Sequence, residues 1–434
     1  MYALFSRLSF LLFISAMFIS MWVSNGLACG LMMPIVKAIL MELERMGILE
    51  MYQMVDKTRQ QSSRHEQKSP KPTDFTVFYF LGIAYSSTLG GIATLSGSNS
   101  NDVLKYYFES YFPDGPKLEF PHFMLLNLPG VLLMESLLYL WLNFFFMGMF
   151  RSQSDIALQI GISEEEAQYI QTLLANQYIQ LGRISFHEAV VAIVVFLDIT
   201  FDAVSFATRG HSNVSSPTIV FVVLLYILPR NMEFMRFFRR RSATSVSPLP
   251  IKETNGCLNW DLVRDNMLWE VIFIIGSSSI IFDNMMMSQM ANEFETFLLY
   301  FKEWPVMVLS LIVIVLCKTL TEFASNSSVA YLILPCIARF SVLAKVNPIY
   351  MMTAATISGS LPFNLITGTS AHAFVIAYVN MPHYKMVQAG IGPSLFSIII
   401  IWSTVTLWAT TIWPDIMLYP AWAAKDLIIV NITS

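Results

Sequence analysis

The sequence predicts an all-α integral membrane protein, and three observations lead to this expectation. Of its 434 residues, 55% are hydrophobic and only 13% are charged, whereas a soluble domain carries roughly 25% charged residues. Several apolar stretches reach the roughly 20 residues that a helix needs to cross a bilayer. Other apolar stretches are interrupted near their middle by Gly, Pro, Ser or Asn, so some spans are expected to be discontinuous.

Two classes of apolar segment follow from this pattern. Continuous spans are expected at 121–149, 188–207, 217–229, 268–288 and 388–415. Interrupted segments occupy 8–42, 76–107, 305–342 and 349–380. Unwound backbone is tolerated at membrane depth only where it lines a cavity or is buried in protein. Discontinuous segments are therefore the sequence sign of a transporter's binding site.

The polar connectors predict the orientation in the membrane. Those at 43–75, 150–187 and 230–267 hold most of the Lys and Arg, including the run 239–241, so the positive-inside rule places them in the cytoplasm. The C-terminus then lies outside, as do the glycosylation sequons at Asn213 and Asn431. Residues 1–29 also allow a signal peptide, but their apolar character continues to Leu40.

These boundaries define the expected organisation. It comprises a first re-entrant hairpin (1–42), a cytoplasmic connector (43–75), the first broken helix with the following spans (76–229), a basic cytoplasmic connector (230–267), the second hairpin with the second broken helix and last spans (268–415), and an extracellular C-terminal tail (416–434).

Composition and motifs argue against most other classes. The net charge of -4 suggests no nucleic-acid partner, and the four Cys and six His show neither CxxC nor HExxH spacing. An alternative is a membrane-embedded enzyme using Asp198 and Asp202, which share a helix face at i, i+4. A solvated position near Arg209 explains them equally well, and no catalytic partners are evident. Glu135 and Asp283 also lie in spans without obvious partners. We therefore expect that the chain is not an enzyme.

A short pattern occurs twice. Ser24-Asn25 and Ser325-Asn326 each interrupt an apolar hairpin, and a Pro follows nine residues after each Asn. Each hairpin is followed by an interrupted helix, at 97–101 and at 368–372. The predicted connectivity gives the two copies opposite orientation, which is typical of the inverted repeats of alternating-access carriers.

The chemistry of these interruptions favours ions. Unwound backbone offers carbonyl oxygens, which suit Na⁺ as a hard cation, and free helix N-termini suit carboxylate or sulfate oxygens. Ser and Asn side chains add uncharged donors and acceptors. A single Ser-Asn pair is explained more simply as the cap of a kinked helix. Two copies, each followed by a break, favour a binding site.

The motifs resemble those of the sodium-coupled dicarboxylate/citrate/sulfate solute carriers, the "I'm not dead yet"-like divalent anion:sodium symporters. The likeness runs along nearly the whole chain. It rests on the segments 21–25 (Met-Trp-Val-Ser-Asn), 90–97 (Gly-Gly-Ile-Ala-Thr-Leu-Ser-Gly), 321–326 (Thr-Glu-Phe-Ala-Ser-Asn) and 419–422 (Tyr-Pro-Ala-Trp).

The resemblance implies an elevator-type, homodimeric symporter in the plasma membrane, with Na⁺ as coupling ion and no other cofactor. It implies one Na⁺ site at Ser20, Ser24, Asn25 and Gly97, and a second at Thr321, Ala324, Asn326 and Gly368. It implies that the substrate, such as succinate or citrate, meets Asn25, Gly26, Ser98, Asn326, Ser327 and Thr369.

The chain departs from the family pattern at several positions. Gly26 replaces a Thr, so one protein hydroxyl that would bind the substrate is lost. Ala28 and Cys29 also replace threonines. Ser100 replaces a Pro in the first break, and Ser370-Ala371-His372 replaces Pro-Pro-Asn in the second. His372 is either a proton-linked charge or a plain polar replacement.

The family has roughly three or four further helices before its first hairpin, whereas Met1 falls just ahead of that hairpin here. The sequence is then either incomplete or a reduced form. A non-transporting, regulatory paralogue that assembles with a full-length carrier is the alternative function.

Overall fold

The computed structural model describes residues 2–45, 49–53, 71–148, 182–209, 215–231, 256–288 and 290–425, together with residues 47, 172, 175 and 179. Within these ranges the chain is helical and forms no strand, only two isolated β-bridges. The all-α prediction is therefore confirmed for this part of the protein. The arginine run 239–241 and the sequons at 213 and 431 lie outside the described residues.

The helices form two compact units, one from residues 1–161 and 268–434 and the other from residues 162–267. The smaller unit pairs two apolar helices and ends in a short one: α8 (Phe186–Arg209), α9 (Ser215–Ile227) and α10 (Trp260–Asn266). Everything below concerns the larger unit unless stated otherwise.

The first half of the larger unit is a helical hairpin followed by an interrupted helix. The elements are α1 (Tyr2–Ser20), α2 (Asn25–Arg45), α3 (Asp74–Gly91), α4 (Asn99–Tyr111) and α5 (Phe120–Phe146). We call residues 21–24, between α1 and α2, the first tip, and residues 92–98, between α3 and α4, the first break.

The second half repeats this order. After α11 (Trp269–Met287) and α12 (Met290–Leu299) come α13 (Val306–Phe323), α14 (Asn326–Leu343), α15 (Pro348–Gly359) and α16 (Ser370–Val379). The chain ends in a long helix with a π-helical turn and a short last helix: α17 (His383–Ser403), η3 (Thr404–Trp408), α18 (Ala409–Ile412) and α19 (Ala421–Lys425). Residues 324–325 form the second tip and residues 360–369 the second break.

Local signals explain where several of these helices begin and end. Asn347 accepts a hydrogen bond from the backbone N–H of Ile349 at 3.0 Å, and Pro348 fills the first helical position of α15. Asn380 adopts a left-handed conformation (φ 53°) after α16, and Pro382 follows it. Ser325 caps α14 by accepting from the N–H of Ser328.

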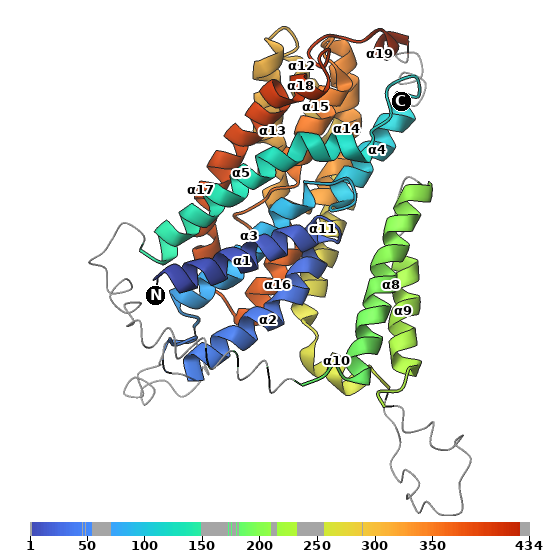
Figure 1. The fold of residues 1–434 in the computed structure, drawn as a ribbon. Coiled ribbons are helices and arrows are strands. Elements are labelled where there is room, and N and C mark those ends of the chain that lie inside the picture. Colours follow the sequence, from blue (N-terminus) through green and yellow to red (C-terminus); the bar gives the residue numbers. More distant parts are fainter. Residues whose placement is uncertain are drawn as a thin grey trace, which may run out of the picture. The chain divides into compact units, whose positions relative to one another are not determined.

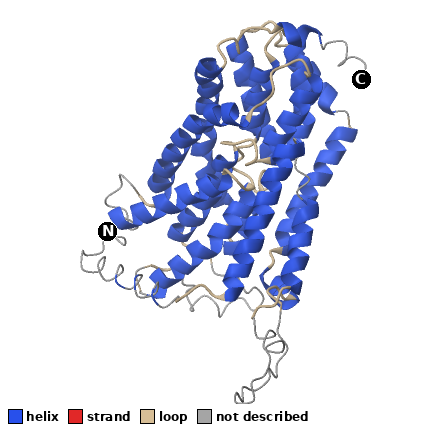
Figure 2. Ribbon diagram, turned by 45° about the vertical axis from the view of Figure 1, so that its right-hand side comes forward, coloured by secondary structure: helices blue, strands red, loops and turns tan. Residues whose placement is uncertain are grey.

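The two halves exchange their interrupted helices. Both arms of the first hairpin pack on α3, and both arms of the second pack on α15. Beyond each break the chain crosses to the other half, so that α4 packs on α14 and α15 while α16 packs on α2 and α3 (Figure 1). Loop segments consequently lie in the middle of the helical bundle as well as at its ends (Figure 2). This crossing brings both breaks and both tips together in one unit, although Trp22 and Ser24 of the first tip stay exposed.

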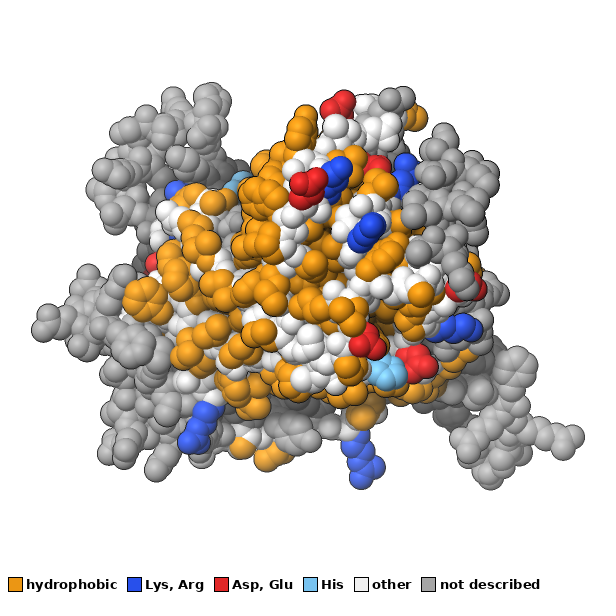
Figure 3. Space-filling view, turned by 90° about the horizontal axis from the view of Figure 1, so that it is seen from above, with side chains coloured by type: hydrophobic (Ala, Val, Ile, Leu, Met, Phe, Trp, Pro, Cys, Tyr) orange, Lys and Arg blue, Asp and Glu red, His pale blue; other side chains and the backbone are white. Residues whose placement is uncertain are grey.

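Length and apolarity confirm a multi-pass membrane protein. Five described helices suffice to cross a membrane: Asn25–Arg45, Phe120–Phe146, Val306–Phe323, Asn326–Leu343 and His383–Ile412. Large apolar side chains, among them Leu132 and Leu140 of α5 and Leu395 and Ile399 of α17, are exposed on the outer faces. Lipid covers such faces at no cost, whereas water does not. Seen from above, hydrophobic side chains gather over the middle of the described surface, with Lys, Arg, Asp and Glu side chains among and around them (Figure 3).

The observed boundaries refine the predicted ones. Helix α2 extends to Arg45, beyond the predicted limit of the hairpin at 42. The start of the predicted tail, 416–434, is packed: Trp422 of α19 contacts the rings of Phe108 and Phe112 at 5.9 and 5.5 Å between centroids. Residues 426–434 lie outside the described part.

Candidate functional site

The first tip holds Ser20 and Asn25 against the end of α3. Ser20 Oγ donates to the carbonyl of Ser87 at 2.5 Å and lies 3.1 Å from Asn25 Oδ1. Gly91 permits this approach, because a Cβ at that position would lie 2.0 Å from Asn25 Oδ1. Ser20 and Asn25 are both buried, so two predicted site residues share one hydrogen-bonded cluster.

The first break is fastened to this tip by neutral side chains. Thr94 Oγ1 donates to the carbonyl of Met21 and accepts from the N–H of Gly97. Asn101 Nδ2 donates to the carbonyls of Gly91 (3.0 Å) and Thr94 (2.7 Å). A Cβ on Gly97 would lie 3.0 Å from the Ser20 carbonyl oxygen and 2.8 Å from that of Gly91. Backbone carbonyls therefore gather around Gly97, as a site for a hard cation requires.

The second tip makes an equivalent contact. A Cβ on Gly368 would lie 2.9 Å from the Thr321 carbonyl oxygen, just as Gly97 meets that of Ser20. The N–H of Asn326 donates to the Gly368 carbonyl at 3.1 Å. Asn326 Oδ1 accepts from the N–H of Ser327 at 2.7 Å. Predicted residues of the second ion site are thus brought together at one tip and one break.

The second break is held by charged side chains. The Glu322 carboxylate accepts from the N–H groups of Phe363, Asn364 and Leu365 at 3.0–3.1 Å, and from Asn364 Nδ2 at 2.9 Å. Lys318, one turn earlier on α13, donates to the Leu361 carbonyl, and its Nζ lies 4.8 Å from the Phe363 ring centroid. Both charged residues are buried. They satisfy backbone groups that the interrupted helix leaves free.

The hydroxyls of Ser98 and Thr369 lie at matching positions at the ends of the two breaks. Ser98 and Thr369 occupy the N-cap positions of α4 and α16 with similar dihedrals, φ/ψ of -141°/138° and -141°/148°. Each hydroxyl is buried, and neither forms a hydrogen bond with any residue that the structure describes. A buried hydroxyl without a partner is costly unless something else binds it. Both were predicted to bind substrate.

The remaining predicted residues divide into two groups. Gly26 and Ala324 are buried beside their tips, and Ser327 is half-buried at the start of α14. Ser24 is different: it is exposed, whereas Ser20 and Asn25 of the same predicted ion site are buried. Its carbonyl accepts from the N–H of Ala28 at 3.0 Å.

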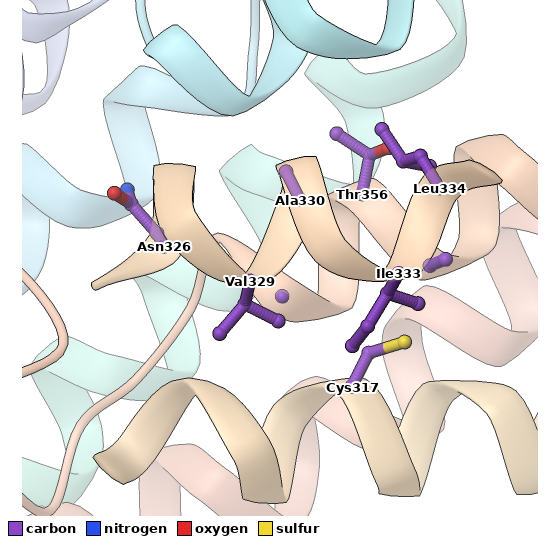
Figure 4. A pocket seen from close by; sticks show the side chains of 9 residues that line it. Cys317, Asn326, Val329, Ala330, Ile333, Leu334 and Thr356 are labelled. Carbon is purple, nitrogen blue, oxygen red and sulfur yellow. The ribbon is translucent and has the colours of Figure 1, made fainter. Parts of the chain in front are cut away.

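A narrow cavity lies beside Asn326 (Figure 4), where Cys317 and apolar side chains of α14 face one another. Its volume is about 10 Å³, which holds one water molecule at most. Apart from Asn326 and Thr356 its lining is apolar. The cavity is therefore too small for an organic ligand.

Lys318 and Glu322 are functional candidates that were not predicted from the sequence. Both lie inside the apolar segment 305–342 at i, i+4 spacing, and an ionisable residue within a span is a functional candidate by default. That signal was sufficient to single them out. Their partners in the second break, roughly 40 residues away, are visible only in the structure.

Other predicted polar residues have structural partners. Glu135 has no obvious partner in the sequence; in the structure Ser86 Oγ donates to Glu135 Oε1 at 2.8 Å, where α5 packs on α3. Asp198 accepts from Thr218 on the neighbouring α9 at 3.2 Å, an inter-helix contact. The side chains of Asp202 and Asp283 lie outside the described residues.

His372 is fully buried between the two halves. Its Nε2 lies 3.4 Å from Thr88 Oγ1, and its ring meets that of Tyr85 edge-on at 5.2 Å. Neither contact brings a carboxylate to the ring. This environment fits the plain polar replacement better than a proton-linked charge.

Comparison with known proteins gives the family. A family model described as "Citrate transporter" matches residues 3–358. The chain belongs to the citrate transporter family. The chain is also similar to three animal proteins. It is 31% identical to "Protein I'm not dead yet" of Drosophila melanogaster, over 96% of this chain and 72% of that protein. It is 24% identical to the Na(+)/citrate cotransporter of Rattus norvegicus, over 95% and 76%, and 23% identical to Na(+)/dicarboxylate cotransporter 3 of Homo sapiens, over 99% and 77%.

Membership of the citrate transporter family confirms the predicted resemblance. These relatives are transporters and not enzymes, which confirms that expectation and sets aside the membrane-embedded enzyme built on Asp198 and Asp202. The helical bundle and its apolar outer faces are those of a membrane transporter.

Proposed function

We propose that this chain is a secondary-active transporter that carries small di- or tricarboxylates, such as succinate or citrate, together with Na⁺. The observation that carries the proposal is the pair of buried, unpartnered hydroxyls of Ser98 and Thr369 at two helix N-termini inside the bundle. The Na⁺/citrate and Na⁺/dicarboxylate cotransporters among its relatives support the substrate class.

The substrate site would use helix N-termini in place of arginines. Helices α2, α4, α14 and α16 all begin at a tip or a break, and an N-terminus offers free N–H groups and the positive end of the helix dipole. Substrate carboxylates would meet the residues predicted from the sequence: Asn25, Gly26, Ser98, Asn326, Ser327 and Thr369.

The Na⁺ sites would lie one at each tip. The carbonyl oxygens of Ser20 and Gly91 beside Gly97 support the first, and that of Thr321 beside Gly368 supports the second. Ser20 and Asn25 side chains would complete the first site, and Ala324 and Asn326 the second. Oxygen ligands without thiolate or imidazole suit a hard cation of this kind.

We further propose that the two halves form an inverted repeat and that hairpins and broken helices move together as an elevator. The matched contacts support this: each hairpin packs on its own broken helix, and each broken helix crosses to the other hairpin. A homodimer in the plasma membrane with an extracellular C-terminus remains the expected assembly.

One set of observations favours a second candidate, a regulatory paralogue that does not transport by itself. Gly26, Ser370 and His372 differ from the family pattern at or beside the proposed site. Such a protein would assemble with a full-length carrier and change its activity.

Uptake of radiolabelled succinate and citrate in cells expressing the chain tests the proposal, in Na⁺ and in choline buffer. Asn326→Ala should abolish uptake. Asn284→Ala is the matched control, because this asparagine is exposed on α11 and its side-chain hydrogen bond among the described residues stays within the helix, to the Ile280 carbonyl. Equal uptake in choline would refute Na⁺ coupling. No uptake despite surface expression, with altered uptake by a co-expressed full-length relative, would favour the regulatory paralogue.

A further inference from the structure

Helices α2 and α16 meet closely at their N-termini. A Cβ at Gly26, the second residue of α2, would lie 2.3 Å from Ser370 Oγ and 3.1 Å from Ser370 Cβ. Cys29 Sγ, one turn further along α2, lies 3.7 Å from the Ala371 carbonyl oxygen. The side chain that position 26 lacks is therefore replaced in space by the hydroxyl of Ser370.

We propose that Ser370 is a substrate-contacting residue whose hydroxyl donates a hydrogen bond to a substrate carboxylate, in place of a side chain at position 26. This inference rests on the proposed function. Ser370, directly after the second break, would act beside Gly26, directly after the first tip. The two residues would form one functional pair.

The position of Ser370 suits this role. It is the first residue of α16, directly after Thr369, whose buried hydroxyl also lacks a partner. Ser370 is half-buried, and its hydroxyl forms no hydrogen bond to the residues that the structure describes. Each Cα–Cβ bond of a helix tilts toward its N-terminus, so the Ser370 side chain lies at the same end of α16 as the free N–H groups that favour an anion.

The chemistry also fits the substrate. A carboxylate is an acceptor only, and hydrogen bonds to a charged acceptor are about twice as strong as neutral ones. The backbone N–H groups of α2 and α16 supply donors of fixed direction, and a serine hydroxyl adds a donor that rotates to follow the carboxylate. Gly26 keeps the first tip open because its missing side chain leaves space for that hydroxyl.

This pairing predicts a reciprocal pattern in transport kinetics. Ser370→Ala should raise KM for succinate or citrate by about tenfold or more, as loss of a hydrogen bond to a charged group does, with little change in maximal rate per surface transporter. Gly26→Thr should lose uptake, because the new side chain clashes with Ser370. Gly26→Thr combined with Ser370→Gly should recover part of the uptake, because it moves the hydroxyl to α2 and removes the clash with Ser370, while Phe374 Cε2, 3.2 Å from a Cβ at position 26, has to shift slightly.

Gly30→Thr is the matched control, since this glycine is one turn away on α2 and a Cβ there meets nothing within 4 Å. It should transport like the wild type. The same variants are purified in detergent, and the rise of Tm with added succinate or citrate is measured beside uptake. If Gly26→Thr does not reach the membrane, the KM of Ser370→Ala alone tests the role of Ser370.

An unchanged KM in Ser370→Ala, with uptake still abolished by Asn326→Ala, would overturn the role of Ser370 and leave the proposed function intact. A wild-type chain with neither uptake nor a substrate-dependent rise of Tm would overturn the proposed function and this inference with it. A raised KM with recovery in the double variant would establish the pair.

Discussion

The first break fastens its freed backbone groups with neutral side chains, whereas the second break uses a lysine and a glutamate. In the first, Asn101 and Thr94 serve the freed carbonyls. In the second, Glu322 serves three freed N–H groups and Lys318 a carbonyl. Every backbone group freed at membrane depth needs a partner, and the comparison teaches that either kind of chemistry can supply it.

The neutral and the charged interactions differ in how much stability is lost when one of them is removed. A neutral hydrogen bond contributes about 0.5–1.5 kcal/mol net, whereas removal of one partner from a buried charged arrangement costs about 3–5 kcal/mol. The second break should therefore be the more sensitive of the two to single substitutions, although both hold equivalent glycines against equivalent carbonyls.

The largest effect is expected for Glu322→Gln. The amide keeps the size of the carboxylate but replaces one acceptor oxygen with a donor, which then faces backbone N–H groups and leaves Lys318 without its counter-charge. We expect a loss of about 3–5 kcal/mol in unfolding free energy and no uptake. Thermal unfolding in detergent measures this; an unchanged Tm would contradict the four-bond arrangement around Glu322.

Lys318→Met tests whether the two charges act as a unit. The first hairpin has a methionine, Met17, three residues before Ser20, as Lys318 stands three before Thr321. We expect Lys318→Met to destabilise by about 2–4 kcal/mol. The double variant with Glu322→Gln should lose less than the sum by about 1 kcal/mol or more, because neither charge is then left unpaired. Strict additivity in this double-mutant cycle would refute the coupling.

A matched pair of hydroxyls sharpens the comparison. Thr94 Oγ1 bonds two backbone groups and is buried, whereas Thr367 is half-buried and donates to the Glu322 carbonyl at 2.6 Å. We expect Thr94→Val to cost about 2 kcal/mol and Thr367→Val about 1 kcal/mol. Equal losses of stability for Thr94→Val and Thr367→Val in thermal unfolding would mean that the first break depends on its threonine hydroxyl no more than the second break does.

The smallest effect is expected for Glu135→Gln, the control for Glu322→Gln. This carboxyl is buried on α5, and its only described hydrogen bond comes from Ser86 Oγ. A glutamine oxygen can accept that bond, so we expect a change below about 1 kcal/mol in either direction. A loss as large as that of Glu322→Gln would show that burial of the acid, not the number of its bonds, sets the cost.

Much of the fold follows from local sequence. Apolar runs of sufficient length give the spans, and Ser-Asn with a Pro nine residues on marks both tips because Ser and Asn favour helix starts. Glycine and small polar residues mark both breaks, but the observed breaks, 92–98 and 360–369, begin earlier than the predicted interruptions at 97–101 and 368–372, whose later residues already belong to α4 and α16. These signals act within a few residues, so the sequence alone suffices to read them.

The site depends on contacts that local signals do not encode. The pairing of Gly26 with Ser370 joins positions far apart in the chain, and Glu322 finds its donors beyond the intervening α14 and α15. Ser24 and Asn25 are adjacent, yet only Asn25 is buried. The sequence by itself determined the helices, the tips and the breaks. Only the tertiary structure decided which freed backbone groups, hydroxyls and charges meet, because packing of α4 and α16 across the two halves sets those distances.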